Sequence, residues 1–172
     1  MMFVSLGIGT VVAVILITIV SLVTGGATRD VFPSNSFDGH VVAPYELNLL
    51  SGGHIEMPWA SGHPAVLVLF ASWCEPCRAE KPRVAAWVKN HDLGAVRFVG
   101  VNVNDTTSSA VAFVKKFHVG FQVVTDSSTT TSAFNIGALP DTVFVRSDGT
   151  VDQIVVGSVS NTQLRLGVSE LR

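Results

Sequence analysis

The only two cysteines in the 172-residue chain are Cys74 and Cys77, and two residues separate them. The apolar residues 66–70 predict a buried strand just before this pair, and residues 79–90 have the apolar spacing of a helix face. Thiols at these positions of a strand-to-helix turn come close enough to form a reversible disulfide. Free N–H groups at the helix start stabilise a thiolate on Cys74, and Pro76 suits a first helical turn because its missing N–H costs nothing there. We therefore predict Cys74 as the nucleophile and Cys77 as the thiol that resolves a mixed disulfide.

Two other interpretations of the cysteine pair are a structural disulfide and a metal site. A structural bridge between adjacent helical turns would close a very short loop and restrict the unfolded chain little. Structural zinc usually takes four ligands, often a second pair of Cys or His. The five histidines of this chain are instead scattered singly: His40, His54, His63, His91 and His118. We favour redox chemistry and expect neither a metal nor another cofactor, with a metal- or copper-handling module as a remaining alternative.

Residues 70–82 resemble the active-site segment of a known family. Trp73 stands immediately before the first cysteine, Glu80 follows the second by three residues, and a distant Leu139-Pro140 step completes the pattern. In these features the chain resembles membrane-anchored thiol–disulfide oxidoreductases of the TlpA, ResA and DsbE type, which have a thioredoxin fold. The resemblance extends from about residue 43 to residue 156.

Glu80 lies three residues after Cys77, so the two side chains share a helix face. In similar proteins an acid at this place lies near the thiols and affects their protonation. The resemblance therefore implies that Glu80 takes or returns the proton of Cys77. The alternative is a solvated helix charge, paired with Arg78 or Arg83. Glu75, between the cysteines, is expected to be exposed and to act through its charge.

Leu139-Pro140 is the second element of the expected site. Statistics alone predict a trans peptide bond, since only about 5–6% of X-Pro bonds are cis in folded proteins. The resemblance implies the opposite, a cis-proline that faces the cysteines. It also implies that the backbone of Leu139 pairs with an extended substrate segment. Asp141 departs from the Thr that usually follows this proline in related proteins.

The residues around the cysteines form the rest of the expected substrate-binding surface. The resemblance implies that Trp73 lies at the surface beside Cys74 and offers apolar contact to partners. An ordinary core tryptophan is the simpler alternative. Glu75 and Pro76, between the cysteines, are assigned to the same substrate-binding surface.

Charges near the pair predict the direction of electron flow. A strongly stabilised thiolate makes a disulfide oxidising, and the helix start favours such a thiolate on Cys74. Three potential negative charges that we expect to face the site oppose this thiolate: Glu75, Glu80 and Asp141. Arg78 is the only basic residue that we expect close by. Like charges disfavour a second anion and raise the thiol pKa, so we predict a reductant.

Residues 3–23 carry no charge and are dominated by Val, Ile and Leu. A helix of about 21 residues spans roughly 31 Å, the thickness of a hydrocarbon core. A cleavable signal peptide is the alternative, but its apolar part would be long, and no Lys or Arg precedes it. We predict an uncleaved single-pass membrane anchor in residues 1–28, a flexible linker in residues 29–43 and the catalytic domain in residues 44–172. The resemblance, rather than the charge pattern, places that domain outside the cytoplasm.

The remaining patterns predict an α/β fold with a mixed sheet. Strands and helices alternate first, and a hairpin around Asp148-Gly149 closes the sheet. The resemblance narrows this to a thioredoxin fold, a mixed central sheet flanked by helices, with an added N-terminal β-hairpin. Residues 126–132, rich in Ser and Thr, are expected to be a loop with a helix cap. The other predicted strands are 45–49, 54–57, 96–103, 122–125, 142–146 and 153–156, and the other helices are 109–117 and 161–171.

Composition limits the possible functions. A formal net charge of -2 gives no support for nucleic-acid binding, which needs a basic face. The resemblance implies a reductase that frees thiols in exported proteins, such as apocytochrome c before haem attachment, and that receives its electrons from a membrane electron-relay protein. The alternative is an oxidase that inserts disulfides into exported proteins. A peroxidase is disfavoured because both thiols lie in one short motif, directly after Trp73.

Overall fold

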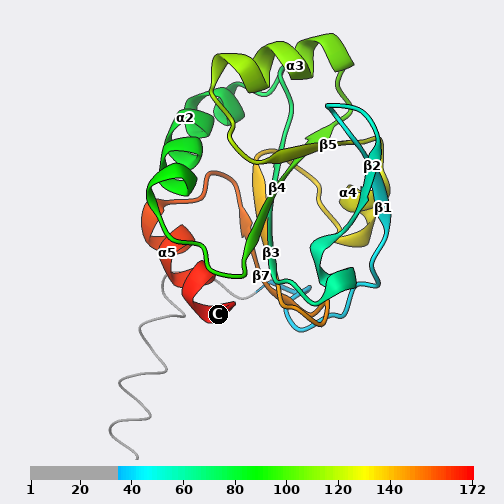
Figure 1. Ribbon diagram of the computed structural model, residues 1–172, viewed down its shortest axis with the longest axis vertical. Coiled ribbons are helices and arrows are strands. Elements are labelled where there is room, and N and C mark those ends of the chain that lie inside the picture. The colour runs from blue at the N-terminus through cyan, green and yellow to red at the C-terminus, as the bar shows by residue number, and fades with distance from the viewer. Residues whose placement is uncertain (1–34) are drawn as a thin grey trace, which may run out of the picture. The chain divides into compact units, whose positions relative to one another are not determined.

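The computed structural model describes residues 35–172, which form a seven-stranded mixed sheet with helices packed against it (Figure 1). The α/β class and the mixed sheet that the sequence predicts are confirmed. The strands are β1 (Glu46–Leu49), β2 (His54–Glu56), β3 (Ala65–Phe70), β4 (Arg97–Val103), β5 (Gln122–Asp126), β6 (Asp141–Val145) and β7 (Val151–Val156). The helices are α2 (Glu75–Asn90), α3 (Thr107–Lys116), α4 (Thr129–Ala133) and α5 (Asn161–Glu170), with a short 3-10 helix, η1, at Pro58–Ser61.

The sheet has the order β2-β1-β5-β4-β3-β6-β7, and its centre is parallel. β3 pairs in parallel with β4, and β4 pairs in parallel with β5. β6 and β7 continue the sheet in antiparallel fashion on the other side of β3. β1 and β2 pair with each other and extend the opposite edge beside β5. The carboxyl end of β3, where the cysteines follow, is therefore flanked by strands on both sides.

β3 is completely buried, as its unbroken apolar run predicts. Successive residues of a strand point to opposite faces of the sheet. Leu69 accordingly belongs to a core cluster with Trp59 and Phe134, whereas Phe70 packs with the two cysteines. In the first cluster, the Trp59 ring makes edge contacts with Tyr45 and Phe134, with ring centroids 5.9 and 6.2 Å apart. Packing on both faces fixes the strand that leads into the cysteine motif.

α2 and α5 lie side by side next to the sheet (Figure 1). Arg83 of α2 joins them, because its guanidinium donates hydrogen bonds to the Val159 carbonyl and, at 3.0 Å, to Asn161 Oδ1. α5 approaches the sheet closely at Gly167, where a Cβ atom would overlap the Phe144 ring. Glycine at this position therefore lets the last helix cover the sheet beside α2.

One segment that the sequence predicts as a loop contains a helix. α4 forms inside the Ser- and Thr-rich stretch. The Asp126 carboxylate accepts hydrogen bonds from the N–H groups of Thr130 and Thr131 at 3.1 and 3.4 Å. The Thr130 hydroxyl also accepts one from the Tyr45 hydroxyl at 3.1 Å. The polar residues that predict a loop thus accept the first free N–H groups of a short helix and anchor it to Tyr45.

The end of the predicted linker is ordered. The Gly39 N–H donates to the Val151 carbonyl at 2.8 Å, and the Val42 N–H donates to the Gly149 carbonyl at 2.9 Å. These residues therefore belong to the domain and are not a free coil. The predicted anchor in residues 1–28 and the start of the linker lie outside the described residues. Within residues 35–172, the helices are too short or too polar to cross a membrane.

Candidate active site

Cys74 and Cys77 form a disulfide at the start of α2, with their Cα atoms 5.3 Å apart. Cys74 is the N-cap residue of the helix, and its sulfur accepts a hydrogen bond from the Cys77 N–H at 3.2 Å. The helix start thus directs an N–H group and its dipole at the Cys74 sulfur, which favours a thiolate there. Cys74 keeps 5% of its surface exposed, and Cys77 keeps none. An incoming thiol or disulfide therefore reaches Cys74 first.

Trp73 stands out from the surface beside the disulfide, with 63% of its area exposed. Its indole N–H donates a hydrogen bond to the Asn104 carbonyl at 3.1 Å, which fixes one edge of the ring. Asn104 has a left-handed backbone, with a φ of 46°, in the loop between β4 and α3. Trp73 is therefore a surface residue, and the core-tryptophan interpretation is wrong.

The loop before Cys74 is held by Asp105, a residue that no sequence motif marks. One carboxylate oxygen accepts hydrogen bonds from the Ser72 N–H at 2.6 Å and the Asn102 amide at 3.1 Å. The other accepts from the Ser72 hydroxyl at 2.9 Å and the Thr106 N–H at 2.8 Å. Partial burial alone would raise the pKa of Asp105, but these hydrogen bonds outweigh it and hold the pKa below its ordinary value. Asp105 thus stays ionised and ties the active-site loop to the end of β4.

The Leu139-Pro140 peptide bond is cis, as the family resemblance implies. Pro140 is buried and immediately precedes β6. Leu139 packs against the cluster that contains both cysteines. The two motifs are far apart in the sequence and meet because β6 pairs with β3, the strand that leads to the cysteines.

Two clefts meet at Trp73. The first has a volume of about 410 Å³ and lies between Trp73, Val103 and the residues 136–139 that precede the cis-proline. The second has a volume of about 720 Å³ and is lined mainly by polar side chains, among them Asn104 and Asp105. Because the first cleft joins the exposed indole to Leu139, it is the candidate binding site for a polypeptide segment beside the disulfide.

A family model and several known proteins match the chain over the region of this site. The model of the AhpC/TSA family matches residues 39–154. The chain belongs to the AhpC/TSA family. Among curated relatives, the thiol-disulfide oxidoreductase ResA of Bacillus subtilis is 28% identical over 128 residues, which cover 74% of this chain and 72% of ResA. The predicted likeness to proteins of the ResA and DsbE type is therefore confirmed.

Solved structures of members of this group have the same fold. DsbF of Mycobacterium tuberculosis, in mixed oxidised and reduced forms, matches with a TM-score of 0.67 and 31% identity, over 74% of this chain and 95% of DsbF. A secreted disulfide oxidoreductase of the same organism, homologous to E. coli DsbE, matches with a TM-score of 0.64 and 29% identity, over 74% of this chain and 96% of that protein. The predicted thioredoxin-like fold is thus confirmed.

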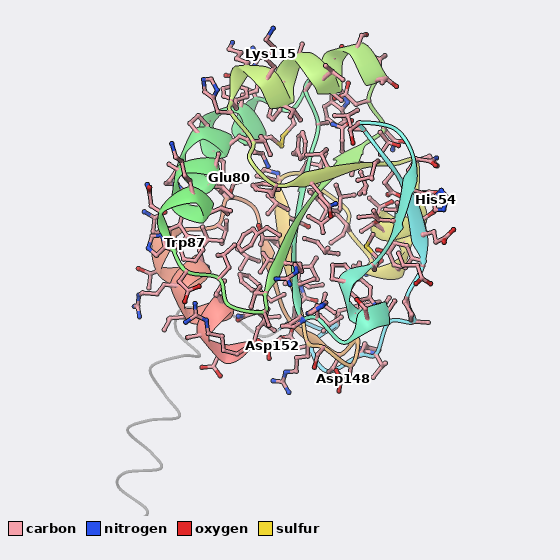
Figure 2. All side chains as sticks on the ribbon, in the orientation of Figure 1. His54, Glu80, Trp87, Lys115, Asp148 and Asp152 are labelled. Carbon is pink, nitrogen blue, oxygen red and sulfur yellow. A yellow bond between two sulfur atoms is a disulfide. The ribbon has the colours of Figure 1, made fainter. Side chains whose placement is uncertain are left out.

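Glu80 is buried on α2 of this AhpC/TSA family member (Figure 2). Its Oε1 atom accepts a hydrogen bond from the Val159 N–H at 2.7 Å and lies 3.8 Å from Arg83 Nη2. Its Oε2 atom has no hydrogen-bond partner among the described residues. Burial raises the pKa of Glu80, while Lys81, the Val159 N–H and Arg83 lower it in part. Glu80 is therefore a buried acid with an increased proton affinity, and the interpretation as a solvated helix charge is wrong.

Glu75, in contrast, is exposed to solvent, as predicted. Its side chain is 87% exposed and pairs with Arg78 at 3.5 Å across one helical turn. Pro76 is also exposed and lies in the first turn of α2, as predicted. Water and Arg78 screen the charge of Glu75, so it influences the cysteines less than a buried carboxylate would.

Two further charged residues are buried near Glu80. Lys81 is completely buried, so Arg78 is not the only basic residue close to the cysteines. Asp141, the first residue of β6, is 2% exposed and accepts a hydrogen bond from the Gly157 N–H at 2.9 Å. Burial raises the pKa of Asp141 to about 6, with the Gly157 N–H opposing the shift and Glu80 adding to it. Two acids and one amine are thus enclosed on the inner side of the disulfide.

The sequence contains weak signals for the residues that prediction missed. Asp105 follows the end of a predicted parallel strand, and polar residues after such strands gather at one edge of the sheet. Lys81 lies four residues after Cys77, which places it on the same helix face. Neither signal distinguishes these residues from ordinary surface charges. Within residues 35–172, the His, Cys, Asp and Glu side chains form no group of three that could hold a metal ion.

Proposed function

We propose that this protein is a membrane-tethered thiol–disulfide oxidoreductase that reduces disulfides in exported proteins. The observation that carries the proposal is the disulfide at the start of α2, in which Cys74 keeps a small exposed surface and Cys77 keeps none. The exposed Trp73 and the cleft that it shares with Leu139 support a polypeptide substrate. The similarity to ResA, which is named a thiol-disulfide oxidoreductase, supports the same activity.

In the reducing direction, the reaction starts from a Cys74 thiolate and a Cys77 thiol. The thiolate attacks one sulfur of the substrate disulfide and expels the other sulfur as a thiolate. Cys77 then gives its proton to Glu80, and its sulfur attacks the Cys74 sulfur. The Cys74–Cys77 bond forms, the Cys74–substrate bond breaks, and the second substrate thiolate leaves. Two electrons pass to the substrate, which becomes a dithiol by taking one proton from Glu80 and one from water.

Glu80 suits this proton transfer because of its environment. Glu80 lies one helical turn from Cys77, and its Oε2 atom is not engaged by another described residue. Burial raises the pKa of Glu80, and a base works best when its pKa lies near the operating pH. Glu75 is a poorer candidate, since its side chain is exposed to solvent and pairs with Arg78.

The proposed substrates are exported proteins with a pair of cysteines, such as apocytochrome c. Trp73 and the backbone of Leu139 would contact the substrate segment, with Pro76, Glu75 and Pro140 at the edges of the contact. A membrane electron-relay protein would then return the disulfide to the dithiol. The M. tuberculosis relative is described as secreted, which supports a catalytic domain outside the cytoplasm.

Disulfide formation is a second candidate function, and the buried Lys81 favours it. A positive charge near the cysteines stabilises thiolates, and a stabilised dithiol form makes a more oxidising disulfide. The pairing of Glu75 with Arg78 also screens one of the negative charges that predict a reductant. The direction of electron flow therefore depends on two opposing effects on the cysteine thiolates. Negative charge on Glu80 and Asp141 destabilises them, and the positive charge of Lys81 stabilises them.

The midpoint potential of the full-length protein in detergent decides between the two directions. Equilibration with glutathione and dithiothreitol buffers is expected to give a value near that of thioredoxin, about −270 mV, rather than that of DsbA, about −120 mV. A value near that of DsbA would refute the reductase and support the oxidase. Failure of the wild-type protein to reduce insulin disulfides while also failing to oxidise a dithiol peptide would overturn both.

The location outside the cytoplasm has its own test. Cys74 in intact cells whose protein has been shown to be reduced should react with a thiol reagent that cannot cross the membrane. The Cys74→Ser variant is the control for labelling at the other cysteine. Protection of the reduced protein until the cells are lysed would contradict the extracytoplasmic location.

A further inference from the structure

Lys81 is a completely buried lysine one helical turn beyond Cys77. Helix residues three and four apart share a face, and the buried face of α2 contains Cys77, Glu80, Lys81 and Val84. The Lys81 Nζ atom lies 4.2 Å from the centroid of the Phe70 ring. Phe70 packs in the same cluster as both cysteines. The amine is therefore enclosed next to the dithiol, where its charge acts in surroundings that contain little water.

The Lys81 amine has no hydrogen-bond partner among the described residues. Lysine is almost never fully buried unless it is paired, because removing its charge from water is costly. Leu or Met would fill the same space without that cost. Burial lowers the pKa of Lys81 to about 8, with the Glu80 carboxylate opposing the shift. The side chain is therefore mostly charged at neutral pH, although packing alone does not require a charge at this position.

The groups that act on Glu80 come from three parts of the fold. On α2, Lys81 and Arg83 both attract the carboxylate, and Lys81 has the larger influence. On β6, the Asp141 carboxyl group and Glu80 repel each other. Before α5, the Val159 N–H donates to Glu80 Oε1. Without Lys81, Glu80 would lose the nearby positive charge that lowers its pKa most.

We propose that Lys81 is a positioning residue for the dithiol reaction, because its buried ammonium keeps Glu80 ionised and able to accept the Cys77 proton. The inference rests on the proposed function and adds the group that controls its proton acceptor. The bonds that change stay the same: Cys77 loses its proton to Glu80, its thiolate attacks Cys74, and the Cys74–substrate bond breaks. Lys81 itself neither gains nor loses a proton in this step.

A single-turnover experiment isolates loss of the Cys77 proton. When 5,5′-dithiobis(2-nitrobenzoate) reacts with the reduced full-length protein, attack by Cys74 releases the first thionitrobenzoate, and attack by Cys77 releases the second. This leaving group needs no proton at neutral pH, so the second phase reports on Cys77. Lys81→Met and, independently, Lys81→Gln should move the pH midpoint of the second phase up by about one unit. At pH values below the wild-type midpoint, the second phase should then be about tenfold slower. Lys81→Arg, which keeps the charge, should remain near the wild-type profile.

Val84→Ala is the matched control, because it removes packing from the same buried face without changing a charge. Its midpoint should equal that of the wild type. In a Glu80→Gln background, the shift caused by Lys81→Met should largely disappear, because the group through which Lys81 acts is gone. An unshifted Lys81→Met profile, an equal shift in Val84→Ala, or an undiminished shift in the Glu80→Gln background would overturn the inference. Absence of the second phase in the wild type would instead refute the proposed function.

Discussion

The outer and inner sides of the first turns of α2 are built differently. On the outer side, hydrogen bonds fix the loop before Cys74 to Asp105 and the Trp73 ring to the Asn104 carbonyl. On the inner side, Glu80 Oε2 and Lys81 Nζ are buried without a hydrogen-bond partner among the described residues. The outer side therefore holds a fixed geometry, while the inner side encloses charges that are free to respond to a change at the sulfur atoms.

This difference separates two tasks of the site. A fixed loop presents Cys74 and Trp73 to a partner in one orientation. Buried groups with altered pKa values instead determine when Cys77 loses its proton. Because an unpaired buried charge lowers stability, its presence beside reactive groups indicates a role in function. Changes on the outer side should therefore affect partner recognition, and changes on the inner side should affect the pH dependence.

The largest effect is expected at the boundary of the two sides, where Cys74 keeps 5% of its surface exposed and Cys77 keeps none. Cys74→Ser should abolish disulfide exchange, because Cys77 cannot be reached from solvent. Cys77→Ser should instead leave Cys74 joined to its substrate, since nothing remains to break the mixed disulfide. Non-reducing electrophoresis would show this adduct as a band that dithiothreitol removes. Turnover by Cys74→Ser, or the absence of an adduct in Cys77→Ser, would contradict the assignment of the two thiols.

The next largest effect is expected for Glu80→Gln on the inner side. Loss of the proton acceptor should slow the second thionitrobenzoate phase by about 100-fold at pH 7. Because burial raises the pKa of Glu80, the wild-type rate should fall as the pH drops through that raised value, and Glu80→Gln should lose this dependence. Glu75→Gln is the control, since Glu75 is exposed and pairs with Arg78. Equal effects of the two variants would show that general electrostatics, rather than a buried acceptor, controls the step.

The outer side is largely predictable from the sequence because its signals are local. Cys74, Pro76 and Cys77 fall within one helical turn, and the start of that turn is enough to predict a reactive thiol. The family resemblance adds the exposed Trp73 and the cis form of Pro140, which X-Pro statistics alone do not predict. The positions of most strands and helices along the chain also follow from apolar spacing, with ends that differ by one or two residues in most elements.

The inner side is less predictable because burial of a charge depends on distant segments. Lys81 looks like an ordinary helix surface residue until Phe70 of β3 is placed against it. Asp105 reaches Ser72 only because β3 and β4 run parallel, so that the residues after Phe70 and after its partner Asn102 meet at one edge of the sheet. Spacing along the chain does not contain these contacts.

A smaller effect, on stability, is expected for Asp141→Asn. Burial raises the folded-state pKa of Asp141 from 3.8 to about 6, so the folded protein binds this proton more tightly than the unfolded chain. The contribution of Asp141 to the free energy of unfolding is fully present below about pH 4. It is lost as the pH rises through about 6. Asn can still accept the Gly157 N–H, so the variant should be more stable by roughly 3 kcal/mol at pH 7.

Urea unfolding of wild type and Asp141→Asn between pH 4 and pH 8 measures this difference. The stability gained by the variant should grow from about pH 4 to about pH 6 and then stay constant. A gain that does not change with pH would show that Asp141 is not a strained buried acid. A loss of stability at pH 7 would show that its charge is needed by the groups around it.

The smallest effect is expected for Trp73→Ala, and it sharpens the division between the two sides. Trp73 is 63% exposed, so its removal should change stability little, but an exposed indole beside a cleft offers contact area to a polypeptide. We expect kcat/KM for a protein disulfide to fall about tenfold, which is about 1.4 kcal/mol of contact energy, with little change for oxidised glutathione. Val111→Ala on α3, also at an exposed apolar position, should change neither.

Trp73→Ala should also keep the wild-type pH midpoint of the second thionitrobenzoate phase, whereas Glu80→Gln should keep the wild-type preference for protein over small disulfides. If each variant altered both properties, recognition and proton transfer would share one set of contacts, and the two sides of α2 would not be separate.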